Sequence, residues 1–252
     1  MTEPRTSRFQ SFDGQEIAYH RMGEGRPLVL LHGFLSSAHQ NWFAPGHAAR
    51  LAAAGFEVIA ADLRGHGQSA APVEPEAWLP DTLARDQLAL IAHLGLSDFD
   101  LAGYSLGART AVRAVVGGLA PRRMALGGMG DTGVMEAGAR AAMFEDSIRH
   151  GDKAQNPRAG RYIQRTMAEL GLNPEAMLGV LAAFKETSRA ELAAIAVPTL
   201  VVCGADDQDN GSAEALADIL PAGRVEIIPG DHIGAVAQAE LSQAIADFLT
   251  AP

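Results

Sequence analysis

The chain has 252 residues, of which 48% are hydrophobic and 20% are charged, and this ordinary globular composition predicts one large domain or one domain with an insertion. The formal net charge is −10 and the sequence holds no block of lysine and arginine, so we expect neither a nucleic acid nor an anionic membrane as a partner. The single cysteine, Cys203, excludes an intrachain disulfide, and no apolar stretch approaches the roughly 20 residues of a membrane span. Because no apolar signal-peptide core is visible near the N-terminus, we expect a cytoplasmic protein.

Strand-like and helix-like stretches alternate along most of the chain. The first stretch, "RFQSFDGQEIAYHRMG", predicts two strands joined by a turn at Asp13-Gly14. Short apolar runs predict further, buried strands within residues 27–33, 56–62, 98–105, 123–130, 197–207 and 224–230. Helices are expected within residues 41–54, 79–95, 106–118, 212–220 and 235–249. This alternation predicts an α/β fold with a doubly wound, mostly parallel sheet of about eight strands.

The segment 131–195 interrupts this alternation once. It contains three helix-like stretches and no strand-like run, and the sequences "HGDKAQNPR" and "GLNP" within it are typical of turns. We therefore predict a small helical lid, inserted after the sixth strand into a core formed by residues 1–130 and 196–252.

Three side chains with complementary chemistry follow three of the predicted parallel strands. Ser105 lies in "GYSLG" after one strand, Asp207 follows "TLVVCG", and His232 follows "RVEIIPGD". The carboxyl ends of parallel strands meet at one edge of a sheet, where ligands bind. A serine needs a neighbouring imidazole to take its proton before it can act as a strong nucleophile, and a carboxylate holds that imidazole in the right tautomer.

The motifs "LHGF", "DLRGHGQS", "GYSLG", "VPTLVVCGADD" and "IPGDH", in this order, resemble the α/β-hydrolase superfamily over nearly the whole chain apart from the insertion. The closest subgroup looks like the small bacterial esterases, haloperoxidase-type perhydrolases, enol-lactonases and C–C hydrolases. The resemblance implies Ser105 as the nucleophile and His232 as the base. It places the acid three residues after Gly204, at Asp207, while some hydrolases of this fold use an acid at the position of Asp131.

The same resemblance implies an oxyanion hole formed by the backbone N–H groups of Phe34 and Leu106. It also implies that His32 is structural and bonds to nearby backbone. Apolar side chains of the insertion and of the neighbouring loops are the candidates for the substrate pocket. These candidates are Leu35, Met135, Met143, Phe144, Met167, Phe184 and Ile233.

Six arginines of the insertion either lie on an exposed helix surface or grip a substrate carboxylate, and the sequence leaves both interpretations open. They are Arg140, Arg149, Arg158, Arg161, Arg165 and Arg189. No group of His, Cys, Asp and Glu has the spacing of metal ligands, so we expect no metal and no cofactor.

These residues together predict a serine hydrolase that cleaves a small or medium carboxylic ester, thioester or lactone through an acyl-enzyme on Ser105. The expected partner is a small-molecule acyl substrate, and the oligomeric state is open. Alternatives are a C–C bond hydrolase, perhydrolase or lyase with the same triad, or a non-hydrolytic sensor of small molecules on the same scaffold.

Overall fold

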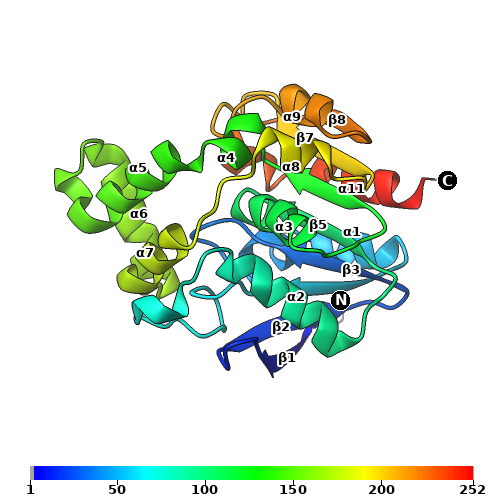
Figure 1. Cartoon of the computed structure of the whole chain (residues 1–252), viewed down its shortest axis with the longest axis horizontal. Coiled ribbons are helices and arrows are strands. Elements are labelled where there is room, and N and C mark those ends of the chain that lie inside the picture. Colours follow the sequence, from blue (N-terminus) through cyan, green and yellow to red (C-terminus); the bar gives the residue numbers. More distant parts are fainter. Residues whose placement is uncertain (1–2, 252) are drawn as a thin grey trace.

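A single mixed sheet forms the centre of the computed structural model, which describes residues 3–251. Its strand order is β1-β2-β4-β3-β5-β6-β7-β8 (Figure 1). The strands are β1 (Arg5–Gln10), β2 (Glu16–Met22), β3 (Arg26–Leu31), β4 (Phe56–Ala61), β5 (Asp100–Tyr104), β6 (Met124–Gly127), β7 (Thr199–Gly204) and β8 (Gly223–Ile228). Strands β1 and β2 are antiparallel to their neighbours, and β3 to β8 run parallel. The predicted fold class is thereby confirmed.

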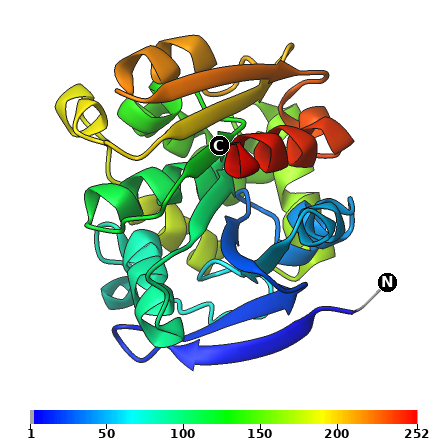
Figure 2. The same ribbon diagram turned by 90° about the vertical axis from the view of Figure 1, so that its right-hand side faces the viewer.

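Helices cover both faces of this sheet (Figure 2). One face carries α1 (His47–Ala53) and α11 (Ala239–Thr250). The other face carries α2 (Thr82–Leu94), α3 (Leu106–Val116) and α9 (Ala213–Ile219). Because successive side chains of a strand point to opposite faces, Leu28 and Leu30 of β3 join one apolar cluster while Val29 and Leu31 join the other. This two-sided burial explains why the parallel strands read as continuous apolar runs.

Two of the predicted helices are interrupted. The expected helix within residues 41–54 consists of a π-helical turn, η1 (His39–Phe43), and of α1, separated by the turn at Pro45-Gly46, where Gly46 has a φ of 84°. The C-terminal stretch forms a short helix, α10 (His232–Ala235), before α11 begins. Asp231 caps α10 by accepting a hydrogen bond from the N–H of Gly234, so His232 opens a helix and does not lie in a loop.

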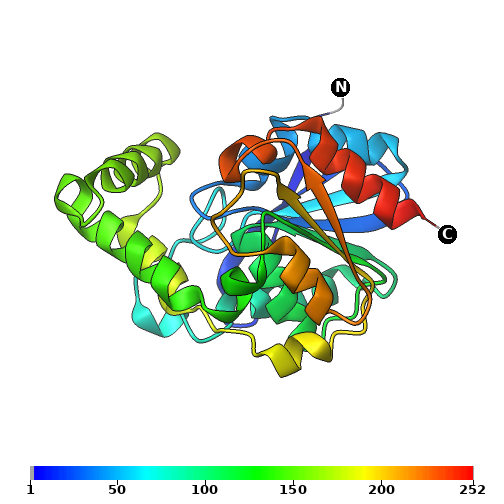
Figure 3. The ribbon, with the colours of Figure 1, turned by 90° about the horizontal axis from the view of Figure 1, so that it is seen from above.

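Five α-helices and one short 3-10 helix, η3 (Gly151–Lys153), separate β6 from β7, where the sequence predicts three helices. The α-helices are α4 (Asp131–Met135), α5 (Ala137–His150), α6 (Pro157–Leu170), α7 (Pro174–Ala182) and α8 (Arg189–Ala193). The two additional helices, α4 and α8, have five residues each and are too short to show a helical period. Helices α5 to α7 project to one side of the core, away from both termini (Figures 1 and 3).

Side-chain caps define where the longer helices of this insertion begin. Asn156 accepts from the N–H of Ala159 at the start of α6, and Asn173 accepts from two N–H groups at the start of α7. The turns predicted at "HGDKAQNPR" and "GLNP" thus contain the residues that start the next helix. Within residues 3–251 we find no helix that is both long and apolar enough to cross a membrane.

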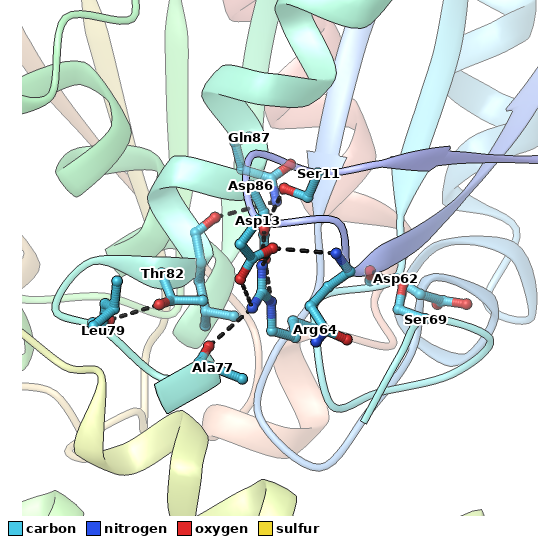
Figure 4. Close-up of polar contacts among 12 residues, drawn as sticks. Ser11, Asp13, Asp62, Arg64, Ser69, Ala77, Leu79, Thr82, Asp86 and Gln87 are labelled. Atoms are coloured by element: carbon cyan, nitrogen blue, oxygen red, sulfur yellow. Dashed lines mark hydrogen bonds and ion pairs between the residues drawn. The ribbon is translucent and has the colours of Figure 1, made fainter. Parts of the chain in front are cut away.

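A buried ionic network around Arg64 connects the first hairpin to the loop after β4 and to α2 (Figure 4). The guanidinium of Arg64 is fully buried and donates to Asp86 at 2.6 and 3.0 Å and to Asp13 at 2.6 and 2.9 Å. It also donates to the carbonyl oxygen of Ala77 at 2.9 Å. Burial raises the pKa of Asp86, against the effect of Arg64 and of the hydroxyl of Ser11. These contacts hold three separate segments of the chain at one point.

We expect Asp86→Asn to lower the free energy of unfolding by about 3 kcal/mol, because it leaves two donors of a fully buried guanidinium without their anion. Urea denaturation at pH 7 measures this loss. Glu16→Gln is the control, because the ion pair of Glu16 with Arg8 is exposed and an exposed pair contributes at most about 1 kcal/mol. Similar losses in the two variants would contradict a stabilising role of the Arg64 network.

Candidate active site

Ser105 lies in a strained turn between β5 and α3. Its backbone has a φ of 52° and a ψ of −112°, a conformation that costs a non-glycine residue about 1–3 kcal/mol. Two glycines permit this turn. A Cβ atom at Gly103 would lie 2.3 Å from the carbonyl carbon of Gly107, and one at Gly107 would lie 2.1 Å from the carbonyl oxygen of Leu31. The strain therefore depends on backbone segments that approach each other without side chains between them.

A chain of two hydrogen bonds connects Ser105 to a carboxylate. The Nε2 atom of His232 lies 3.0 Å from Oγ of Ser105, and its Nδ1 atom lies 2.8 Å from Oδ2 of Asp207. Burial acts to raise the pKa of Asp207, but the hydrogen bond and the charge of His232 outweigh it and the pKa lies below its usual value. Asp207 is therefore ionised at neutral pH and favours the tautomer in which Nδ1 of His232 carries the proton. That tautomer leaves Nε2 free to accept the proton of the serine.

The alternative acid, Asp131, has another contact. It opens α4, and its Oδ1 accepts the N–H of Ser212 at 2.9 Å. Its carboxylate thus ties α4 to the start of α9, while the hydrogen bond to His232 comes from Asp207.

Tyr104 contacts His232, and the sequence did not predict this contact. Its hydroxyl donates to the backbone oxygen of His232 at 2.7 Å, and its ring centroid lies 5.5 Å from that of the imidazole. The side chain is buried, and glycines at positions 127 and 128 leave the space for its ring. Its position directly before the serine was visible in the sequence, but only the fold shows that it reaches His232.

Phe34 and Leu106, whose N–H groups are the predicted oxyanion donors, border the same cavity as Ser105. Leu106 is the first residue of α3, so its N–H has no acceptor within the helix. Asn41, a second residue that the sequence analysis missed, holds the other loop, because its Oδ1 accepts the N–H of Gly33 at 3.0 Å. Directly after Phe34, Leu35 has a positive φ of 52°. Both sides of the predicted oxyanion hole are therefore held in constrained backbone.

Two cavities meet at Ser105. The first, of about 480 Å³, extends along α3 and beneath α5, and the second, of about 420 Å³, lies on the side of His232. Five of the predicted pocket residues line them. Met143 and Phe144 border both cavities, Phe184 borders the first, and Leu35 and Ile233 border the second.

Comparisons with known proteins show the family of this chain. The model of the alpha/beta hydrolase family matches residues 28–247. A non-heme haloperoxidase from Rhodococcus erythropolis is 30% identical over 249 residues, which span 86% of this chain and 89% of that protein. The chain belongs to the α/β-hydrolase family. A hydrolase from Pseudomonas aeruginosa PA01 has the same fold, with a TM-score of 0.80 and 24% identity over 98% of this chain and 99% of the other. A malate-bound thermophilic esterase from Thermogutta terrifontis is similar with a TM-score of 0.72 and 26% identity over 97% and 98% of the two chains.

Two of the residues predicted to line the pocket of this α/β-hydrolase do not border either cavity. Met167 is 4% exposed on α6 and packs with Ile163 inside the insertion, and Met135 is half-buried at the end of α4 against the main apolar cluster. Both predictions are corrected here. Composition alone cannot tell which apolar face of a short helix packs inward and which faces a ligand.

Two buried histidines next to the site, His32 and His66, are neutral and form hydrogen bonds with backbone groups. Nε2 of His32 accepts the N–H of Leu63 at 2.9 Å, so its Nδ1 donates to the carbonyl oxygen of Gly33 at 2.7 Å. Burial lowers the pKa of His32, and it lowers the pKa of His66 to about 3. His32 thus has the structural contacts that the sequence predicts.

One group within residues 3–251 has the arrangement of a metal site, with ligand atoms of Asp207, Asp209 and His232 within 4.8 Å of one another. Its atoms are already engaged, because Asp207 Oδ2 bonds to His232 Nδ1 and its Oδ1 accepts the N–H of Asp209. These contacts fit a hydrogen-bonded acid better than a metal ligand.

We expect Gly107→Ala to destabilise the enzyme by at least about 3 kcal/mol, because the new methyl group would meet the carbonyl oxygen of Leu31 in the central sheet. Urea denaturation measures the loss. Gly138→Ala in α5 is the control, since the nearest atom to its Cβ is Glu186 Oε1 at 3.8 Å and alanine favours a helix by up to about 1 kcal/mol. A Gly107→Ala protein as stable as the parent would refute the close approach of α3 to β3.

Proposed function

We propose that the chain is a serine hydrolase that cleaves a small or medium carboxylic ester, thioester or lactone through an acyl-enzyme on Ser105. The observation that carries the proposal is the continuous chain of hydrogen bonds from Ser105 Oγ through His232 to Asp207, at 3.0 and 2.8 Å. Membership in the α/β-hydrolase family and similarity to a protein described as an esterase support it.

In the first half of the proposed reaction, Ser105 Oγ attacks the carbonyl carbon while Nε2 of His232 takes its proton. Asp207 stabilises the imidazolium that forms. The N–H groups of Phe34 and Leu106 donate to the oxyanion of the tetrahedral intermediate. When the intermediate collapses, the bond to the leaving group breaks and the proton on Nε2 passes to that group.

In the second half, His232 removes a proton from water, and the resulting hydroxide attacks the acyl-enzyme. Collapse of the second intermediate releases the acid and returns the proton to Ser105. The two cavities suit this sequence of steps. The leaving group needs the proton of His232 and therefore occupies the second cavity, and the acyl group occupies the first.

A perhydrolase is the second candidate, supported by the relative named a non-heme haloperoxidase. In this reaction hydrogen peroxide replaces water in the attack on the acyl-enzyme, and a peracid leaves in place of the acid. The yield of acid and peracid in the presence of peroxide distinguishes the two activities.

Replacement of Ser105 by alanine tests the nucleophile. We expect Ser105→Ala to lower kcat for p-nitrophenyl acetate by about a million-fold, because the acyl-enzyme cannot form. A fluorophosphonate probe, followed by mass spectrometry, is expected to label Ser105 of the parent and to leave the variant unlabelled. Equal hydrolysis by both proteins, or a folded parent that resists the probe, would refute the proposal.

Two matched substitutions test the acid. Asp207→Asn is expected to lower kcat by about 10⁴-fold, because the amide no longer favours the required tautomer of His232. Asp131→Asn removes the same charge, and its side-chain oxygen can still accept the N–H of Ser212, so kcat is expected to stay within about threefold of the parent. Steady-state kinetics with the same ester measures both variants. The opposite ranking would move the acid to Asp131.

A further inference from the structure

Arg109 is a buried cation in the wall of the first cavity, four residues after Ser105 on α3. We propose that Arg109 is an anion-binding subsite that selects acyl groups ending in a carboxylate, such as the half-esters of short dicarboxylic acids. The proposal rests on the proposed function of Ser105 and names the substrate class of that site.

Among the described residues, three arginines have nearly buried side chains, and their partners differ. Arg64 contacts Asp13 and Asp86, and Arg113, one helical turn beyond Arg109, contacts Asp81 at 2.7 Å and Glu191 at 3.3 Å. Arg109 is equally buried, with 6% of its surface exposed. Its guanidinium donates to the backbone oxygens of Gly133 and Lys185, and no carboxylate in residues 3–251 comes within 4 Å of it.

The charge of Arg109 is therefore in direct contact with dipoles only, and the carboxylates of Glu186 and Asp81 act on it from a greater distance. The Cζ atom of Arg109 lies 4.9 Å from the ring centroid of Phe184, which adds a cation–π contact. Burial lowers the pKa of Arg109 to about 10, so the side chain still carries its charge at neutral pH. Two carbonyl acceptors occupy only part of the five guanidinium donors. A ligand carboxylate would supply the missing negative charge and accept the remaining hydrogen bonds.

The position of Arg109 sets the direction of the ligand. Residues four apart lie on the same face of a helix, about 6 Å apart along its axis. Ser105 stands at the end of α3 and Arg109 one turn further along the same cavity. An acyl group bound to Ser105 that runs along α3 reaches the guanidinium with its far end.

The lining of the first cavity, which contains both Ser105 and Arg109, is mostly apolar. Met129, Leu181 and Phe184 border the first cavity together with Met143 and Phe144. Two acidic residues also border it, Glu136 and Asp209, but both are exposed, and Asp209 is paired with Arg140 at 3.0 Å. The site thus offers an apolar passage for methylene groups with a cation in its buried wall, which matches an aliphatic chain that ends in a carboxylate.

A matched pair of esters tests the proposal. Mono-p-nitrophenyl adipate and p-nitrophenyl hexanoate have acyl chains of equal length and differ in the terminal carboxylate. We expect the parent enzyme to prefer the adipate in kcat/KM by at least about tenfold, and Arg109→Gln to lose this preference, mainly through a higher KM for the adipate. Arg109→Lys keeps the charge without the planar fork and is expected to retain part of the preference.

Arg161→Gln is the control variant. It removes one positive charge from an exposed position of α6 that borders neither cavity, and we expect the preference to stay unchanged. A parent enzyme that prefers the hexanoate, or an Arg109→Gln variant that keeps the adipate preference, would overturn the proposal. Because the two esters are compared on the same protein, a partial loss of stability in Arg109→Gln does not affect the ratio.

A binding measurement separates this inference from the proposed chemistry. Adipate is titrated by calorimetry into the Ser105→Ala protein, with and without Arg109→Gln, and we expect at least about tenfold weaker binding without the arginine. If neither ester is hydrolysed but adipate binding depends on Arg109, the subsite stands and the hydrolase proposal fails. If adipate binding does not depend on Arg109, the subsite is refuted whatever the enzyme hydrolyses.

Discussion

The close approach of α3 to the central strands is the constraint on which the rest of this site depends. Positions 103 and 107 have no side chains, so the chain can turn sharply enough to leave Ser105 with a φ of 52°. The turn does three things at once. It lifts the serine Oγ to within 3.0 Å of His232, it places the N–H of Leu106 at the open end of a helix, and it directs Arg109 along the first cavity. The energy of the strained turn is offset by the packing of β5 between the parallel strands β3 and β6, which are buried on both faces.

Buried polar side chains hold the loop on the other side of the serine. Asp62, at the end of β4, accepts the N–H of Ala38 at 2.8 Å and that of Gln68 at 2.8 Å, and it contacts His20 at 3.1 Å. Burial acts to raise the pKa of Asp62, but these hydrogen bonds, with that of His20 the strongest, outweigh it and lower the pKa to about 2. The carboxylate is thus a fixed acceptor at neutral pH, and it anchors the loop that carries Phe34. His32 and Asn41 fix the same loop with neutral groups, through hydrogen bonds to the carbonyl oxygen and the N–H of Gly33.

The sequence predicted the sheet well because its signals are local, and the triad stays a prediction that the hydrogen bonds of Ser105, His232 and Asp207 support. Buried strands appear as apolar runs, and the ends of such strands meet at one edge, which places Ser105 and His232 on the same side of the sheet. The choice of Asp207 over Asp131 rested on the family resemblance. The breaks before α1 and α11 were missed, since a turn of two or three residues inside an apolar pattern leaves the period almost unchanged. Met135 and Met167 were assigned to the pocket because the sequence does not show whether a methionine of a helix faces a ligand or the apolar core. Tyr104 and Asn41 were missed because their partners, His232 and Gly33, become neighbours only in the folded chain.

Arg109 and Arg113 show the same limit most clearly. They are four residues apart on one helix, they are equally buried, and nothing in "GARTAVR" tells them apart. They differ in their ion pairs. Asp81 and Glu191, which come from distant segments of the chain, form ion pairs with Arg113 and not with Arg109. The buried guanidinium of Arg113 is thus paired with carboxylates, whereas within residues 3–251 that of Arg109, in the wall of the cavity, donates to backbone oxygens only. The charge of Arg109 can therefore still pair with an anionic ligand. Burying that charge is costly unless something negative accompanies it, and the open space along α3 leaves the ligand as the group that can supply it.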